Sequence, residues 1–135
     1  MSSFNKFNTF VADISNKVHN LGSDQLTIAL TDSAPVATNT VIANISQISY
    51  TNLGSRNITT SSSSQSSGTY KLILTNLTMT ATGVVGPFRY AVIYNSTASG
   101  GPLIGWYDYG SEITMANTDT FTASFDATNG LIQIT

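Results

Sequence analysis

The chain has 135 residues, of which only 9% are charged, and a formal net charge of −2. Its five basic residues are scattered, whereas phosphate binding needs clustered lysine and arginine, so composition argues against a nucleic-acid partner. No apolar run approaches the roughly 20 residues that span a bilayer, no secretory signal is recognisable, and cysteine is absent. We therefore expect no membrane partner, synthesis in the cytoplasm and no disulfide.

Apolar residues recur at spacings of three and four over residues 1–21, which is the helical period. One interpretation is an amphipathic helix that packs on a sheet. The other is an N-terminal docking arm that binds a neighbouring subunit through Phe4, Phe7 and Phe10. His19, the only histidine, falls in this segment, and we expect it at the surface or at a helix end.

The next segments alternate between strand and turn patterns. Residues 24–33 alternate apolar and polar side chains, which predicts a half-buried strand. Apolar residues at helical spacing over 41–48 predict one further short helix. The serine-rich stretch 52–68 has no apolar periodicity, so we predict a loop that holds one short strand near residues 56–60.

Alternation resumes in the second half of the chain. Residues 68–83 predict two strands, and Phe121, Ala123 and Phe125 alternate toward a core. The following Asn129-Gly130 predicts a hairpin turn. Together these patterns predict one mainly β domain over residues 1–135, an antiparallel β-sandwich of roughly seven or eight strands with the N-terminal helix or arm and the short helix.

Two neighbouring segments, "PFRYAVIYN" and "PLIGWYDYG", predict a hairpin that places an ion pair. If Tyr94 opposes Leu103, then Arg89 opposes Asp108, and Trp106 lies diagonally close enough to stack on the guanidinium. The same register pairs Val92 with Gly105, Tyr90 with Tyr107, Phe88 with Tyr109, Ile93 with Ile104 and Ala91 with Trp106. We interpret Arg89 and Asp108 as a structural pair; the alternative is an anion or carbohydrate site formed with Trp106.

Residue chemistry gives little support to catalysis. The single histidine has no evident nucleophile partner, and zinc would lack thiolate ligands and a second histidine. Oxygen-rich stretches at 116–120 and 126–130 leave calcium as an open alternative. Two carboxylate pairs are close enough in sequence to be weighed as glycosidase pairs: Asp108 with Glu112, and Asp119 with Asp126. We predict no catalytic, cofactor or metal residues, and no enzyme.

Several blocks resemble a known group of proteins. The blocks are "LTDSAPVATNTV" (30–41), "SSQSSGTYKL" (63–72), "GPFRYAVIYN" (86–95) and "PLIGWYDYGSEIT" (102–114), followed by "FTASFDATNGLIQI". In this order they resemble small virion structural proteins of tailed bacteriophages, over most of the chain from about residue 26 onward.

The resemblance implies a non-enzymatic component of the virion. A head decoration (cement) protein is the first expectation, often a homotrimer that binds the major capsid protein and stabilises the assembled shell. A tail, baseplate or fibre-associated protein is the second. A carbohydrate-binding module that uses Tyr90, Trp106, Tyr107 and Tyr109 as a stacking platform is a third, from a different class.

Overall fold

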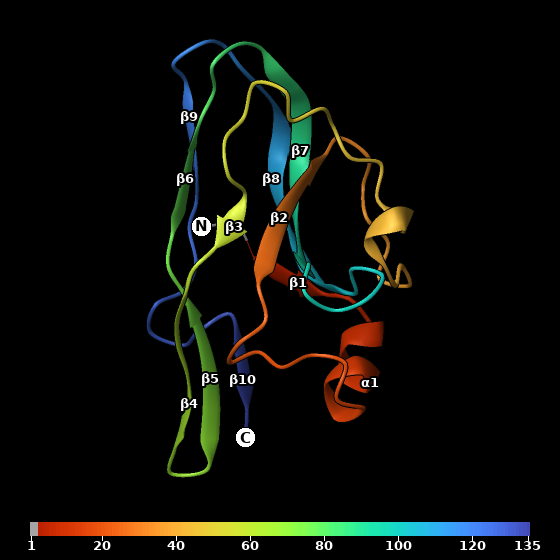
Figure 1. The fold of residues 1–135 in the computed structure, drawn as a ribbon, viewed down its shortest axis with the longest axis vertical. Helices are drawn as coiled ribbons and strands as arrows, with labels where there is room; N and C mark the ends of the chain where they lie inside the picture. The colour runs from red at the N-terminus through yellow and green to blue at the C-terminus, as the bar shows by residue number, and fades with distance from the viewer. Residues whose placement is uncertain (1–2) are drawn as a thin grey trace.

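The computed structural model describes residues 3–135 and is an elongated, sandwich-like arrangement of antiparallel strands with one short α-helix (Figure 1). The elements are β1 (Phe4–Lys6), α1 (Thr9–Ser15), β2 (Leu26–Thr31), a 3-10 helix η1 (Ile42–Asn44), β3 (Asn57–Ile58), β4 (Thr60–Ser66), β5 (Thr69–Leu74), β6 (Leu77–Thr80), β7 (Val85–Asn95), β8 (Leu103–Met115), β9 (Thr120–Ala123) and β10 (Ile132–Ile134). The predicted mainly β sandwich is confirmed.

The strands form three sheets within residues 3–135. The largest has the order β1-β8-β7-β2-β3, a second has the order β10-β5-β4, and the third is the pair β6-β9. One main core lies against the large sheet and takes side chains from all three, such as Ile93 of β7, Leu72 of β5 and Phe121 of β9. This core is what joins the smaller sheets to the large one.

The centre of the large sheet is buried on both faces. Leu26, Ile28 and Leu30 of β2 enter the main core, while Ala29 points to a second cluster on the other side. All six residues of β2 are buried, so the predicted half-buried strand is wrong. The reason is that the segment after β2 returns over this face, where Ile45 joins the second cluster.

The N-terminal segment is a short strand followed by a short helix, so the predicted helix over residues 1–21 is wrong in extent. Strand β1 pairs antiparallel with β8, and α1 ends at Ser15, before a left-handed Lys17 (φ 67°). Residues 1 and 2 of that prediction lie outside the described part of the chain. The short helix predicted over 41–48 is only the single turn η1.

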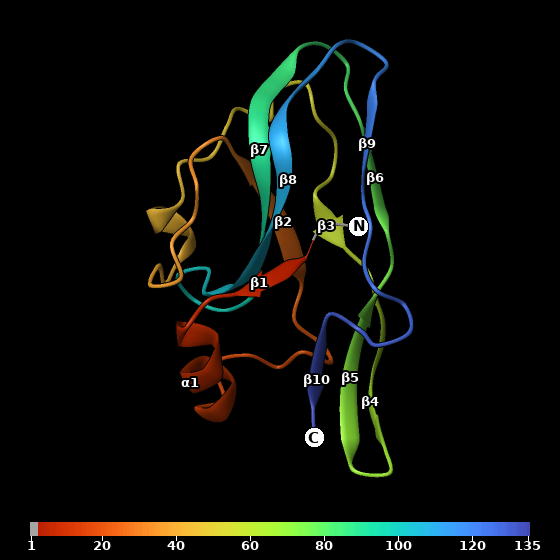
Figure 2. The same cartoon turned by 180° about the vertical axis from the view of Figure 1, so that it is seen from behind.

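The serine-rich segment is also more regular than predicted. Instead of a loop with one strand, it contains β3 and the seven-residue β4, which pairs with β5 and turns at Ser67 and Gly68. Serine has low intrinsic strand preference, and here the pairing with the apolar β5 overrides it. The β4–β5 hairpin extends beyond the rest of the molecule (Figures 1 and 2).

The predicted hairpin at Asn129-Gly130 is wrong, because the strands on either side join different sheets. Strand β9 pairs with β6, whereas β10 pairs with β5. The turn between them is held by Asp126, whose Oδ1 accepts hydrogen bonds from the backbone N–H groups of Thr128 (2.8 Å) and Asn129 (2.9 Å). Phe121, Ala123 and Phe125 are buried as predicted.

We expect Gly105→Ala to destabilise the large sheet. A Cβ at Gly105 would overlap the ring of Phe4 and the backbone oxygen of Asn5, so β1 must move off the edge of β8. Overpacking of this kind costs about 1–3 kcal/mol, measurable by urea unfolding. The matched control is Gly54→Ala, which meets no atom within 4 Å. Equal free energies of unfolding for the two variants would contradict the close contact of β1 with β8.

Candidate functional site

The ion pair between Arg89 and Asp108 is present in the structure. Arg89 Nε donates to Asp108 Oδ1 (2.8 Å) and Nη2 donates to Oδ2 (3.1 Å), so the guanidinium and the carboxylate form a bidentate pair with two parallel hydrogen bonds. Both side chains are 38% exposed. The same Asp108 Oδ1 accepts from the backbone N–H of Gly110 (2.8 Å), which has a left-handed φ of 86°. The pair therefore fixes an irregular stretch of β8.

The register predicted for this hairpin is wrong beyond its first pair. Tyr94 opposes Leu103 as expected, but the pairing then shifts by one residue, because Ile104 is an extra residue on β8. Asp108 consequently opposes Tyr90 and not Arg89. A second irregularity between residues 88 and 90 brings the Arg89 side chain back to Asp108. The bulges change the pairing and preserve the ion pair.

The stacking predicted between Trp106 and Arg89 is replaced by other contacts. Trp106 packs on Phe7, with ring centroids 4.6 Å apart, and the Arg89 guanidinium lies 5.4 Å from the centroid of the Tyr90 ring. Tyr107 is buried in the main core. Burial raises the pKa of Tyr109 to about 12, and it also raises the pKa of Tyr107.

These aromatic side chains do not form a platform for sugars. Tyr107 and Tyr109 point into the sandwich, and the ring of Tyr109 meets Phe121 edge to face at 5.0 Å. Stacking platforms need exposed, coplanar rings, whereas Tyr90 and Tyr107 are buried. The arrangement gives the aromatic cluster a role in packing.

The phenylalanines predicted to bind a partner are mostly used by the chain itself. Phe7 is fully buried in the second cluster and Phe10 lies in the main core. Phe4 is partly buried against Tyr107, with ring centroids 5.6 Å apart. In this structure β1 and α1 fold back onto the large sheet, so Phe7 and Phe10 are covered by the chain itself and Phe4 is only partly covered. A docking role for Phe4, Phe7 and Phe10 stays a prediction.

The oxygen-rich turns weighed as calcium sites use carboxylates to hold the backbone. Asp119 Oδ2 accepts from the N–H of Ala116 (2.8 Å), as Asp126 does from the two amides that follow it. Backbone and side-chain hydrogen bonds lower the pKa of Asp126. Within residues 3–135, no group of three or more potential acidic or histidine ligands gathers in one place.

His19 is buried, so the prediction of a surface or helix-end residue is wrong. Its side chain is 5% exposed, its ring lies 5.3 Å from the Phe10 ring, and its Nδ1 is 3.0 Å from Asn95 Nδ2. Asn95 also donates to Asp24 Oδ2 (2.7 Å). Nothing in the sequence indicated this network, because its members are up to 76 residues apart.

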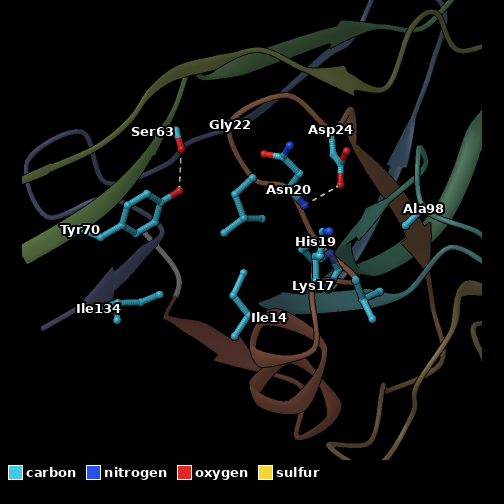
Figure 3. A pocket seen from close by; sticks show the side chains of 12 residues that line it. Ile14, Lys17, His19, Asn20, Gly22, Asp24, Ser63, Tyr70, Ala98 and Ile134 are labelled. Carbon is cyan, nitrogen blue, oxygen red and sulfur yellow. Dashed lines mark hydrogen bonds between the residues drawn. The ribbon is translucent and has the colours of Figure 1, made fainter.

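The network borders a groove between the segment from α1 to β2 and the strands β4, β5 and β10 (Figure 3). The groove has a volume of about 590 Å³. Ile14, Lys17 and His19 lie on the side of α1, and Ser63, Tyr70 and Ile134 face them from β4, β5 and β10. The Ser63 and Tyr70 hydroxyls are hydrogen-bonded at 2.7 Å.

The second arginine that sequence reasoning left unassigned is also structural. Arg56 Nη1 donates to the backbone oxygen of Ile28 (2.6 Å), and its guanidinium lies 3.6 Å from the centroid of the Tyr50 ring. Tyr50 in turn accepts from the backbone N–H of Leu30 (2.9 Å). These contacts hold the segment before β3 against the edge of β2.

No family model, curated protein or solved structure matches this chain. In residues 3–135 no helix has the length and apolar character needed to cross a bilayer.

We expect Arg89→Gln to raise the pKa of Asp108. The Arg89 hydrogen bonds, followed by the Gly110 N–H, hold that pKa below its ordinary value of 3.8. The stabilisation from this carboxylate is present above the ordinary pKa and is lost as pH falls through the lower folded value. Carboxyl-carbon NMR titration measures the shift, with Arg56→Gln as the control that leaves Asp108 unchanged. An unaltered Asp108 titration in Arg89→Gln would rule out the ion pair in solution.

Proposed function

We propose that this chain is a non-enzymatic structural protein of a bacteriophage virion, and that it decorates the assembled head. The resemblance of four sequence blocks to phage virion proteins supports the virion, and the mainly β sandwich is compatible with it. The way polar side chains are used supports a structural role: Arg89, Asp108, Asp119 and Asp126 each hold part of the fold.

The observation that carries the proposal is the exposed edge of β4. Among the described residues, β4 pairs with β5 alone, so its other edge offers unpaired backbone groups. Proteins usually protect such edges with charges or proline, but the sequence TSSSSQS contains neither. The hairpin also projects from the body of the molecule (Figure 2). An edge of this kind accepts a strand from another subunit.

The major capsid protein and further copies of this chain are the partners in this proposal. An extended segment of a neighbouring subunit adds to β4, and hydroxyls of the serine side chains supply further hydrogen bonds. Binding that favours the closed shell over its loosened form stabilises the shell by mass action. A modest free energy per site is multiplied over the many sites of a lattice. The resemblance also implies a homotrimer, which is part of the proposal.

A tail, baseplate or fibre-associated position is the second candidate. Small β-sandwiches with an open edge serve equally well in those structures, and the same β4 surface would be used. Copy number separates the two locations, because a head lattice offers many more equivalent sites than a tail ring.

Ser62→Lys/Ser64→Lys should weaken attachment to particles, because two added charges on the edge strand oppose strand addition. We expect roughly a tenfold rise in Kd, equivalent to about 1.4 kcal/mol, when the recombinant protein is cosedimented with purified heads stripped of it. The control is Ser99→Lys/Ser111→Lys, which adds the same charge at exposed serines outside the hairpin.

Quantified gels of purified virions complete the test. The head proposal predicts on the order of hundreds of copies per particle, whose summed binding stabilises the shell. A few copies associated with purified tails would support the second candidate. Absence from the particle would refute both, and equal binding of the two lysine variants would refute the role of β4.

A further inference from the structure

The buried contact between His19 and Asn95 depends on the orientation of the Asn95 amide. Asn95 ends β7 and is fully buried. Its Oδ1 accepts hydrogen bonds from the backbone N–H groups of Thr97 (3.0 Å) and Ala98 (3.1 Å). Because backbone N–H groups only donate, this atom must be the oxygen, and the other amide atom must be the nitrogen.

The orientation of Asn95 determines the protonation state of His19. Asn95 Nδ2 donates one hydrogen to Asp24 Oδ2 (2.7 Å) and directs the other to His19 Nδ1 (3.0 Å). An amide nitrogen accepts no hydrogen bond, so Nδ1 must be the acceptor. The ring is therefore neutral, with its proton on Nε2.

The surroundings of His19 oppose a second proton. Burial lowers the pKa of His19 below its ordinary value of 6.5 and outweighs the carboxylates of Asp13 in α1 and Asp24 before β2, which raise it. Lys17, the other charged residue on this side of the groove, adds a positive charge. Within residues 3–135, Nε2–H has no acceptor and is covered, so a ligand in the groove does not reach it.

We propose that His19 is a proton-sensitive latch, which holds the segment between α1 and β2 against the end of β7 while neutral and releases it when protonated. A proton on Nδ1 would place two donors 3.0 Å apart. Asn95 cannot turn its oxygen toward the ring without losing both backbone donors and the bond to Asp24. The ring must therefore move away.

Release of the ring would loosen a defined part of the molecule. Asp24 Oδ2 also accepts from the backbone N–H of Asn20 (2.8 Å), so the loop around His19 is tied to the same carboxylate. Lys17, in a strained left-handed conformation, stands at the other end of this loop. The loop forms one wall of the groove opposite Ser63 and Tyr70 (Figure 3). Opening would thus move this wall of the groove.

The sign of the pH effect follows from the lower native pKa. In the released state His19 titrates near its ordinary value of about 6.5, so that state binds more protons between this value and the native pKa. Release becomes easier as pH falls through this window, by up to tenfold per pH unit, and is independent of pH above about 7. The proposal does not depend on the proposed function in the virion.

Nitrogen-15 NMR of the single histidine tests the latch directly in the full chain. At pH 7 we expect the neutral tautomer with the proton on Nε2, and a titration midpoint below 6.5. Amide exchange, corrected for intrinsic rates, should accelerate over residues 9–24 as pH falls from 6.5, while amides of β7 stay protected. A proton on Nδ1 at pH 7, a midpoint at or above 6.5, or uniform exchange would each overturn the proposal.

His19→Asn is the matched variant, because an asparagine oxygen sits near the Nδ1 position and accepts without titrating. We expect its exchange over residues 9–24 to lose the acid acceleration. If exchange over residues 9–24 still accelerates in acid in His19→Asn, another group causes the acceleration and the proposal is overturned. If this variant does not fold, the tautomer and midpoint of the unmodified chain still decide the question.

Discussion

Burial of β7 on both faces is the constraint on which the rest of the structure depends. Strand β7 lies between β2 and β8, sends Phe88, Ala91 and Ile93 into the main core, and sends Val92 into the second cluster. Full burial of a side chain of this kind contributes roughly 1.5–3 kcal/mol. Because residues 90–93 are buried on both faces of the strand, both faces must be covered there, and the N-terminal segment, the loop after β2 and the smaller sheets supply that cover.

This constraint explains where sequence reasoning succeeded. Alternation around β9 correctly gave its inward residues, since Phe121, Ala123 and Phe125 face one core. It also brought Arg89 and Asp108 together, because β7 and β8 are neighbours joined by a short turn. Local patterns of this sort are sufficient wherever a strand has one buried face and one neighbour in the chain.

The failures have physical causes that a single sequence does not reveal. A bulge is not visible in the side-chain pattern, so the register of β7 with β8 was wrong by one residue from Ile93 to Tyr90 and by four residues at Phe88, which pairs with Ile113. The serine-rich β4 lacks periodicity and forms only because β5 pairs with it. The contact of His19 with Asn95 depends on the tertiary path of the chain, as do the burial of Phe7 and the position of Arg56.

The few charged side chains of this molecule mostly hold parts of its own fold in place. Arg89 and Asp108 fix a bulged stretch, Arg56 binds a backbone oxygen of β2, and Asp126 shapes a turn. The body of the protein is thereby held by its own polar side chains, and the β4–β5 hairpin is the part that projects from it. The body thus needs no partner to hold its polar side chains, whereas the edge of β4, unpaired among the described residues, is free to pair with one. This difference connects the fold to the role proposed in an assembly.

Native-state hydrogen exchange at increasing guanidinium concentration is the most direct test of the central position of β7. The account predicts that amides of β2 and β7 exchange only through global unfolding, and that amides of β4 and β5 exchange earlier, through a smaller opening. Equal or greater protection in β4 than in β7 would contradict it.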